Sequence, residues 1–388
     1  MKVLILLSRI PWPLEKGDKL RAYHHLKIIA KKHKVVLVCL TDAKPHPKAL
    51  ENLSPFCENI HFIKLNKLGI FWNLSTSIFN DKPFQVNYFY QKSAQKKVNL
   101  IIEQHMPKHL FVQLIRTTEY VKKHHIFDST FDYMDAFSMG AKRRVEKAIP
   151  GIKFLLKIEA NRLKKYENYV FNRFKNKTII SKNDQELIQH SKNNDITILP
   201  NGVDFELFKP NTSIEKKYEL VFTGNMSYPP NIKAAHYLAQ KIIPILIKTY
   251  PTIKLIIAGA DPHPSVKKLA SKNISITGWL DQITDAYNEA KIFIAPMQIG
   301  TGMQNKILEA MSMKIPCITS ELAGHAIGAT HNKEILIAHS PKEYAQFVIQ
   351  LLENESFSKK ITNQAHKWVT ENYDWKKNGD ILLDLMTN

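Results

Sequence analysis

Apolar and polar positions follow a repeating scheme along the chain, in which short apolar runs are separated by longer stretches with helical spacing. In the first half, a helix is predicted over 18–33, and strands are predicted over 2–7, 34–40, 60–65, 109–114 and 125–131. In the second half, strands are predicted over 219–222, 253–258, 274–277, 291–295, 316–320 and 334–337. Strands that alternate with helices pair in parallel and are covered by those helices. The pattern therefore predicts an α/β protein with two parallel sheets.

The chain length and one cluster of turn residues indicate two domains. A chain of 388 residues is too long for one hydrophobic core. The strand and helix pattern is interrupted at Pro200-Asn-Gly202, where turn residues cluster. We therefore expect one Rossmann-like domain over 1–200 and a second over 201–370.

The composition is that of a globular protein, with 44% hydrophobic and 23% charged residues. No run of eighteen apolar residues occurs, and Met1 to Leu7 is too short for a membrane span or a signal peptide, so it is predicted to be a buried strand. The three cysteines, Cys39, Cys57 and Cys317, lack the spacing of a metal site. We expect a reduced, cytoplasmic protein with no disulfide, metal or other cofactor.

Positive charge is concentrated in the first half of the chain. Residues 1–200 carry 35 Lys and Arg against 17 Asp and Glu, whereas 201–388 carry 20 against 18. A basic half attracts polyanions, and the candidates are anionic lipid headgroups, lipid-diphosphate substrates and nucleic acid. An ordinary surface of solvated lysines is the alternative.

Two common nucleotide-binding signatures are absent from the sequence. No Gly-x-Gly-x-x-Gly follows the first strand, which disfavours a nicotinamide-dependent oxidoreductase, and there is no Walker loop.

The most informative segment is the Gly-containing loop Met297 to Asn305, which follows an apolar strand and leads into a helix. Gly300 and Gly302 would let the backbone approach a ligand, and the first helical turn would offer free N–H groups to a phosphate. Lys306 adds a cation, and Glu309 can accept hydrogen bonds from hydroxyls. An ordinary strand-to-helix turn is the alternative.

Four stretches together resemble family 4 glycosyltransferases of the GT-B fold, in particular the bacterial transferases of exopolysaccharide and capsule clusters. They are Lys16-Gly-Asp-Lys-Leu-Arg21, Leu199-Pro-Asn-Gly-Val-Asp204, Phe222-Thr-Gly-Asn-Met-Ser-Tyr-Pro-Pro-Asn231, and Gly300-Thr-Gly-Met-Gln-Asn-Lys-Ile-Leu-Glu-Ala-Met311. The resemblance implies two Rossmann-like domains with a deep cleft between them. It also implies that a last helix, within 371–388, crosses back to the N-terminal domain.

The resemblance implies a donor site around Gly17, Gly224, Asn225, Lys306 and Glu309. Gly17 and Gly224 would let backbone amides approach the donor diphosphate, and Glu309 would hold the ribose hydroxyls. Many relatives carry an Arg and a Lys on the loop where Asn225 stands, so Lys306 is the candidate replacement. A simple Lys–Glu pair on one helix face is the alternative for Lys306 and Glu309.

Four further residues complete the predicted donor site. Thr301 stands where many relatives have a first Glu near the transferred sugar, which leaves sugar selection and activity open. Gln304 and Asn305 are the nearby amides for sugar hydroxyls, or else exposed polar residues at a helix start. Trp279 would stack on the nucleobase, or else cap the core.

Candidate acceptor residues lie in the first half. Asp132 and Asp135 follow a predicted strand, at the place where the related branch has Asp-x-x-Asp, and are predicted to be catalytic by orienting the acceptor hydroxyl or the transferred sugar. A helix N-cap role for Asp135 or Ser138 is the alternative. Arg21 is either a surface helix residue or part of the site.

Two segments are candidates for contact with a membrane. The helix-like stretch 141–177 is rich in Lys and Arg beside apolar residues, which suits an anionic membrane or a solvated helix packed on the core. The aromatic segment 70–79 is a second candidate for lipid or acceptor.

The resemblance implies a retaining glycosyltransferase of the hexosyltransferase type, without a bound metal, which moves a sugar from a nucleotide-sugar donor to a glycan or lipid-linked acceptor. We expect it in the cytoplasm, with its N-terminal domain on the anionic inner face of the cell membrane. The alternative is a catalytically silent protein that binds sugar nucleotides or polyanions, since the first Glu and the Arg/Lys pair are missing. Nucleic-acid binding is not expected.

Overall fold

The computed structural model describes residues 1–124, 128–146, 148–299 and 303–387. The chain forms two compact units. Unit 1 comprises Met1–Pro200 with Lys376–Asn388, and unit 2 comprises Asn201–Trp375. The first break thus lies after residue 200, and the second lies after Trp375 rather than after residue 370.

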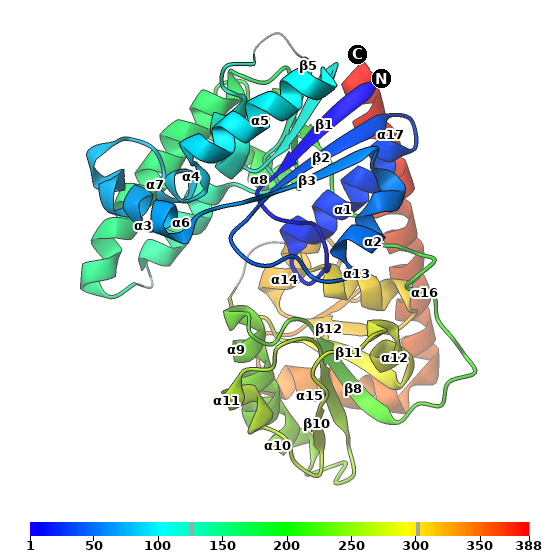
Figure 1. Cartoon of the computed structure of the whole chain (residues 1–388). Helices are drawn as coiled ribbons and strands as arrows, with labels where there is room; N and C mark the ends of the chain where they lie inside the picture. The colour runs from blue at the N-terminus through cyan, green and yellow to red at the C-terminus, as the bar shows by residue number, and fades with distance from the viewer. Residues whose placement is uncertain (125–127, 147, 300–302, 388) are drawn as a thin grey trace. The chain divides into compact units, whose positions relative to one another are not determined.

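Unit 1 is built on a seven-stranded sheet with the order β3-β2-β1-β4-β5-β6-β7, in which every neighbouring pair is parallel (Figure 1). Its strands are β1 (Lys2–Leu7), β2 (Lys34–Thr41), β3 (Asn59–Lys64), β4 (His109–Gln113), β5 (Asp128–Asp132), β6 (Asn176–Ile179) and β7 (Thr197–Ile198). β1 and β2 are apolar on both faces because helices cover the sheet on either side, as parallel sheets require.

Helices connect the strands of unit 1, and the predicted helix over 18–33 corresponds to α1 (Gly17–Ala30). The other helices are α2 (Ala49–Leu53), α3 (Lys67–Thr76), α4 (Phe84–Phe89), α5 (Lys92–His105), α6 (Phe137–Glu146), α7 (Pro150–Phe171), α8 (Lys182–Leu187) and α17 (Trp375–Thr387). Short 3₁₀ segments lie at η1 (Ser54–Phe56), η2 (Ser77–Phe79) and η4 (Asn193–Asp195), and a longer one of seven residues lies at η3 (Ile115–Val121). The last helix, α17, belongs to unit 1 through its residues from Lys376 onward, and Gly379 lies against Ile28 of α1.

Two expectations for unit 1 are corrected. The stretch 141–177 is not one helix, because Pro150 starts α7 as its first residue, a position that proline favours, and the chain enters strand β6 at Asn176. The strands β6 and β7 were not predicted, because they hold only four and two residues.

Unit 2 repeats the scheme with a six-stranded parallel sheet in the order β10-β9-β8-β11-β12-β13. Its strands are β8 (Tyr218–Thr223), β9 (Leu255–Ala258), β10 (Ile274–Ile276), β11 (Ala290–Ala295), β12 (Cys317–Thr319) and β13 (Leu336–Ile337). Its helices are α9 (Pro229–Tyr237), α10 (Ile243–Leu246), α11 (Pro264–Lys267), α12 (Ile283–Asn288), α13 (Asn305–Ser312), α14 (Glu321–Ile327), α15 (Pro341–Glu353) and α16 (Glu355–Asn372), and a π-helical turn, η5 (Leu238–Ile242), joins α9 to α10.

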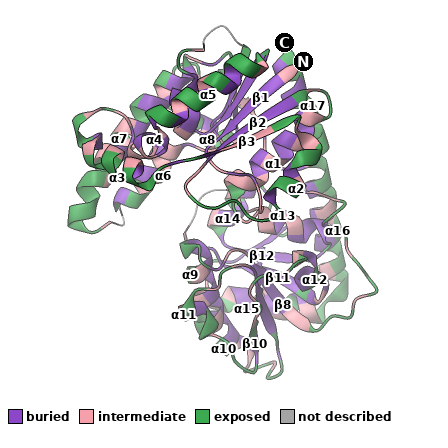
Figure 2. Ribbon diagram, in the orientation of Figure 1, coloured by how far each residue is buried: buried purple, intermediate pink, exposed green. Residues whose placement is uncertain are grey.

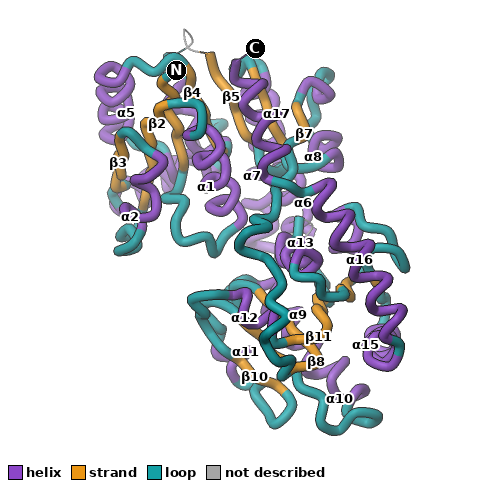
Figure 3. The backbone as a smooth tube through the Cα atoms, turned by 90° about the vertical axis from the view of Figure 1, so that its right-hand side faces the viewer, coloured by secondary structure: helices purple, strands orange, loops and turns teal. Residues whose placement is uncertain are grey.

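Each unit has its own apolar core between its sheet and its helices. The strands are buried, whereas the outer faces of the helices are exposed (Figure 2). Figure 3 shows the strands of each unit with helices packed beside them. Since all strands of a unit run parallel, their carboxyl ends meet at one edge of the sheet, and ligand-binding loops are expected there. Among the described residues, no helix is long and apolar enough to cross a membrane.

Candidate functional site

A polar cluster in unit 2 gathers at the carboxyl end of β8 and the start of α13. Gly224 follows β8, Tyr287 comes from α12, and Lys306 and Glu309 lie one turn apart on α13. The loop after β8 and the first turn of α13 meet because β8 and β11 are parallel neighbours and α13 follows the loop after β11.

Two glycines allow the backbone to pack closely at the carboxyl end of β8. Gly224 has a φ of 145°, and a Cβ there would lie 2.7 Å from Asn231 Nδ2 and 3.2 Å from Lys306 Nζ. Gly259 has a φ of 137°, and a Cβ there would lie 1.9 Å from the carbonyl oxygen of Gly224. Both the backbone conformation and the space require glycine at these positions. The Lys306 ammonium is therefore held directly beside the backbone of Gly224.

Lys306 is positioned by Asn231. Its Nζ donates to Asn231 Oδ1, and Asn231 Nδ2 donates to the carbonyl oxygen of Asn225 at 2.8 Å. The Asn231 amide thus ties the loop after β8 to the start of α13. Burial lowers the pKa of Lys306 to about 8, although Glu309 opposes that change. A cation that has already lost hydration interacts strongly with any anion that replaces the lost water.

Glu309 is positioned by Tyr287. The phenol donates to Glu309 Oε2 at 2.9 Å, and its oxygen lies 2.7 Å from Thr223 Oγ1 at the end of β8. Burial raises the pKa of Glu309 to about 7, while the hydrogen bond from Tyr287 and the charge of Lys306 act in the opposite direction. Glu309 is not fully covered, so the carboxylate keeps capacity to accept further hydrogen bonds.

The alternative of a simple ion pair on α13 does not describe this geometry. Lys306 and Glu309 form no ion pair within 4.0 Å, and each binds a different neutral partner, Asn231 and Tyr287 respectively. The two charges are thus held apart on one helix face.

The other predicted donor residues have contacts of their own. Asn225 Oδ1 accepts from the amide of Ser227 at 2.9 Å, so its side chain shapes its own loop. Asn305 Oδ1 accepts from Asn201 Nδ2 at 3.2 Å, and Gln304 occupies the N-cap position of α13 without a side-chain capping hydrogen bond. Trp279 follows β10 and is 58% exposed, so it does not cap the core. The predicted residues Gly300, Thr301 and Gly302 lie outside the described residues, as does Lys147 of the basic stretch.

In unit 1, Asp132 is the centre of a closed polar network at the end of β5. Arg21 Nε and Nη2 each donate to the carboxylate at 2.8 Å, and Thr178 Oγ1 donates at 2.9 Å. Both Arg21 and Asp132 are completely buried. Arg21 and the hydrogen bonds outweigh the effect of burial and lower the pKa of Asp132 to about 2. Arg21 is therefore not a surface residue, and Asp132 presents no exposed oxygen in this structure.

Asp135 has a different environment from Asp132. Its Oδ1 is buried without a hydrogen-bond partner, and burial together with the charge of Asp184 raises its pKa to about 7. The alternative N-cap role for Asp135 is not seen, because the amides of Ala136 and Ser138 donate to Asp184 at 3.4 Å and Glu167 at 2.9 Å. Asp135 thus holds a carboxyl group with unfilled hydrogen-bonding capacity.

Arg116 lies on η3, after β4, where the charge of Asp135 acts on its guanidinium. Its Nε donates to Gln85 Oε1 at 3.0 Å, while its Nη1 is buried without a hydrogen-bond partner. Leu114, two residues before Arg116, and Met134, directly before Asp135, both have a φ of 66°. Such a conformation costs roughly 1–3 kcal/mol in a residue with a side chain and concentrates at functional sites.

Gly17 is the first residue of α1, in unit 1. A Cβ at this position would meet Met134 Cε at 3.4 Å, which is ordinary contact, so nothing in unit 1 itself requires glycine there. Its role in binding a diphosphate stays a prediction.

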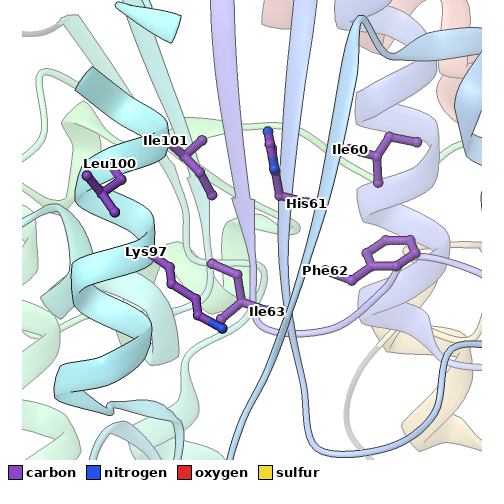
Figure 4. A pocket seen from close by; sticks show the side chains of 7 residues that line it. All are labelled: Ile60, His61, Phe62, Ile63, Lys97, Leu100 and Ile101. Carbon is purple, nitrogen blue, oxygen red and sulfur yellow. The ribbon is translucent and has the colours of Figure 1, made fainter. Parts of the chain in front are cut away.

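A separate hollow of about 410 Å³ lies between the edge strand β3 and α5 of unit 1 (Figure 4). His61 and Ile63 face Lys97 and Ile101, and His61 Nε2 lies 3.2 Å from His105 Nε2. None of the predicted site residues lines this hollow.

Sequence reasoning did not find Asn231 or Tyr287. Asn231 ends the quoted stretch that begins at Phe222, so its place in that stretch was the available signal. Tyr287 lies within a helical pattern as an aromatic residue facing the core, and no sequence feature separates it from a packing residue.

Comparison with known proteins found a family model that matches part of the second unit. Residues 217–354 match the family model described as "Glycosyl transferases group 1". The matched segment lies within unit 2. A curated relative from Klebsiella pneumoniae, described as an uncharacterized 44.6 kDa protein in the cps region, is 24% identical over 400 residues and is matched over 97% of both chains.

Two solved structures share the fold over nearly the whole chain. Sucrose-phosphate synthase from Thermosynechococcus elongatus has a TM-score of 0.70 at 12% identity, with 99% of this chain and 98% of that chain covered. Anabaena HepE, solved in complex with UDP and glucose, has a TM-score of 0.68 at 12% identity, with 99% of each chain covered. The predicted GT-B fold with two Rossmann-like domains is confirmed. The group 1 domain and the cps-region relative support a glycosyltransferase, while membership of family 4 stays a prediction.

Proposed function

We propose that this protein transfers a sugar from a nucleotide-sugar donor, bound by unit 2, to a glycan or lipid-linked acceptor in the synthesis of a surface polysaccharide. The observation that carries the proposal is the cluster in which Asn231 holds the Lys306 ammonium beside Gly224 while Tyr287 holds Glu309. The group 1 domain around this cluster and the cps-region relative support it.

The two charged residues suit the two ends of a nucleoside diphosphate. A carboxylate can accept hydrogen bonds from two neighbouring hydroxyls, so Glu309 is assigned to the ribose. The Lys306 ammonium lies beside the glycine backbone, and is assigned to the diphosphate. HepE, which shares the fold, was solved with UDP and glucose, and this supports a donor of the same class.

We propose transfer with retention of configuration and without a bound metal. The acceptor oxygen forms a bond to the anomeric carbon, the bond from that carbon to the diphosphate oxygen breaks, and the acceptor's proton passes to the leaving diphosphate. Negative charge grows on the diphosphate as its bond to the sugar breaks, so the Lys306 ammonium stabilises the transition state more than the bound donor.

Unit 1 is assigned to the acceptor and to the membrane. Asp135, with its partnerless Oδ1 and a pKa raised to about 7 by burial and by Asp184, is the candidate group for an acceptor hydroxyl. Residues 1–200 carry 35 basic and only 17 acidic residues, and this positive charge favours the inner face of a cell membrane, where a lipid-linked acceptor would be found. We therefore propose a cytoplasmic protein that binds the membrane peripherally.

The test is turnover of a panel of nucleotide sugars with a lipid extract as acceptor, measured as released nucleoside diphosphate. One donor should be consumed, and Lys306→Met should abolish most of that release. Binding of a nucleotide sugar without release in any combination would instead identify a catalytically silent binder, and absence of binding would reject the proposal altogether.

A further inference from the structure

Helix α3 and the turn η2 present large apolar side chains to solvent. Phe71 and Trp72 on α3 are 71% and 69% exposed, and Phe79 on η2 is 87% exposed. Soluble proteins expose single apolar residues routinely, but adjacent aromatic side chains that together form a surface mark a binding site.

The fold holds α3 in this orientation through polar contacts. Asn66 and Gln91 exchange two hydrogen bonds, Asn66 N to Gln91 Oε1 at 3.0 Å and Gln91 Nε2 to Asn66 O at 2.8 Å. Further along the helix, Asn73 Nδ2 donates to the backbone carbonyls of Asn87 and Tyr90. The helix is thus attached to unit 1 by these amide groups and by the buried Ile70, while Phe71 and Trp72 stay exposed.

The first turns of α7 extend this apolar surface. Residues 151–155 are all exposed, including Ile152 and Phe154. Further along, α7 contacts η2 directly, since Arg162 Nη1 donates to the carbonyl of Ser77 at 2.7 Å. Figure 1 shows α3 and the first turns of α7 at the same side of unit 1, and Figure 2 shows both as exposed.

The charges on these two segments all have one sign. Residues 66–80 contain Lys67, and residues 148–158 contain Lys153 and Lys157, and neither segment contains an acidic residue. All three lysines are exposed. Exposed aromatic and aliphatic side chains among lysines suit the headgroup region of an anionic bilayer, where the apolar groups enter the acyl boundary and the ammonium groups bind lipid phosphates.

We propose that α3, η2 and the first turns of α7 form the surface that inserts into an anionic phospholipid bilayer. This assignment rests on the proposed membrane association of unit 1, and it replaces a purely electrostatic contact by a defined apolar one. A protein partner would match the apolar residues equally well, but the absence of acidic residues from both segments favours a uniformly anionic surface. The surface would hold the enzyme where a lipid-linked acceptor is found.

Vesicle sedimentation of the full chain tests the insertion. The parent should pellet with vesicles containing phosphatidylserine or phosphatidylglycerol. The triple variant Phe71→Ser, Trp72→Ser, Phe79→Ser should bind these vesicles at least roughly tenfold more weakly. Leu100→Ser, which changes an exposed apolar residue on α5, is the matched control and should pellet like the parent. Equal pelleting of the triple variant and the parent would overturn the proposal, as would a parent that stays in solution.

Trp72 provides an independent spectroscopic measurement. Its emission should shift to the blue and be quenched by brominated acyl chains when vesicles are added. Trp72→Phe should remove most of this signal, because the four other tryptophans of the chain lie outside the surface. The same variant should still pellet with the vesicles. A signal that is unchanged by Trp72→Phe would overturn the proposal.

Two solution measurements distinguish this surface from the donor site of unit 2 and from a contact between two copies of the chain. Binding of a nucleoside diphosphate to the triple variant, without vesicles, should equal that of the parent, and its loss would point to unit 2 rather than to the surface. In sedimentation velocity the parent should remain the same size as the triple variant. A larger species that the triple variant loses would show that this face joins two copies of the chain, and the proposal would be wrong.

Discussion

Two acidic residues, Asp132 in unit 1 and Glu309 in unit 2, have opposite electrostatic environments in two domains built on similar sheets. Asp132 accepts two hydrogen bonds from Arg21 and one each from Thr178 and Gln113, and its pKa falls to about 2. Glu309 accepts one from Tyr287, and burial raises its pKa to about 7. A carboxylate whose acceptor positions are filled stabilises the fold, whereas one that is desolvated and partly unfilled is prepared for a ligand.

The largest expected effect is on the folding of unit 1. Asp132→Asn removes the carboxylate charge that the buried Arg21 guanidinium faces, which should lower the free energy of unfolding by about 3–5 kcal/mol. Urea denaturation measures this loss directly.

The double variant Arg21→Met, Asp132→Leu should recover much of the stability lost by Asp132→Asn, because the buried guanidinium and the buried carboxylate are both removed. If Asp132→Asn unfolds at the same urea concentration as the parent and loses only activity, the carboxylate acts in catalysis, as the sequence predicts, and the contrast with Glu309 fails.

The second expected effect is on turnover. Lys306→Met keeps most of the aliphatic stem but removes the charge beside Gly224, so kcat should fall by roughly 10²–10³-fold, the scale for one group that stabilises charge in a transition state. Steady-state release of nucleoside diphosphate measures it, with the urea midpoint determined in parallel.

The urea midpoint of Lys306→Met should change little, since its partner Asn231 is neutral and keeps its bond to the Asn225 carbonyl. Lys359→Met, at an exposed pair with Glu355, is the matched control and should leave kcat unchanged. A loss of stability as large as the loss of turnover would make Lys306 a structural residue like Arg21.

The smallest expected effect concerns the pH dependence of donor binding. Glu309→Gln should weaken donor binding by about 1–3 kcal/mol, because a charged acceptor of hydrogen bonds is lost. In the parent, binding should decline below about pH 7, where Glu309 takes up a proton, and above about pH 8, where Lys306 loses one. Calorimetric titration across this range measures both limbs.

Tyr287→Phe separates positioning from packing. The phenol's hydrogen bond lowers the pKa of Glu309, so its removal should move the acidic limb to higher pH, and Glu309→Gln should abolish that limb. An acidic limb at the same pH in all three proteins would mean that another group controls it.

The sequence predicts the architecture well because the two sheets depend on long apolar runs with clear periodicity. The boundaries of β1 are predicted without error, and the loop that leads into α13 is recognisable from its glycines and the strand before it. Lys306 and Glu309 lie on one helix, so their proximity follows from helical spacing alone.

The remainder depends on contacts between residues that are distant in sequence. Arg21 meets Asp132 across 111 residues, and no local pattern separates this buried pair from two exposed charges. Tyr287 meets Glu309 in the same way, from a helix that reads as ordinary core packing. The short strands β6 and β7 lacked a periodic signal, because a strand of two to four residues forms through its neighbours rather than through its own propensity.

The central claim is that Lys306 and Glu309 bind a nucleoside diphosphate. Calorimetric titration with UDP, GDP, ADP and CDP tests it most directly. The proteins to compare are the parent, Lys306→Met, Glu309→Gln and the control Lys359→Met. At least one nucleotide should bind to the parent and to Lys359→Met with equal affinity, and both site variants should bind it more weakly. The account is contradicted if none of the nucleotides binds to the parent, or if all four proteins bind them equally.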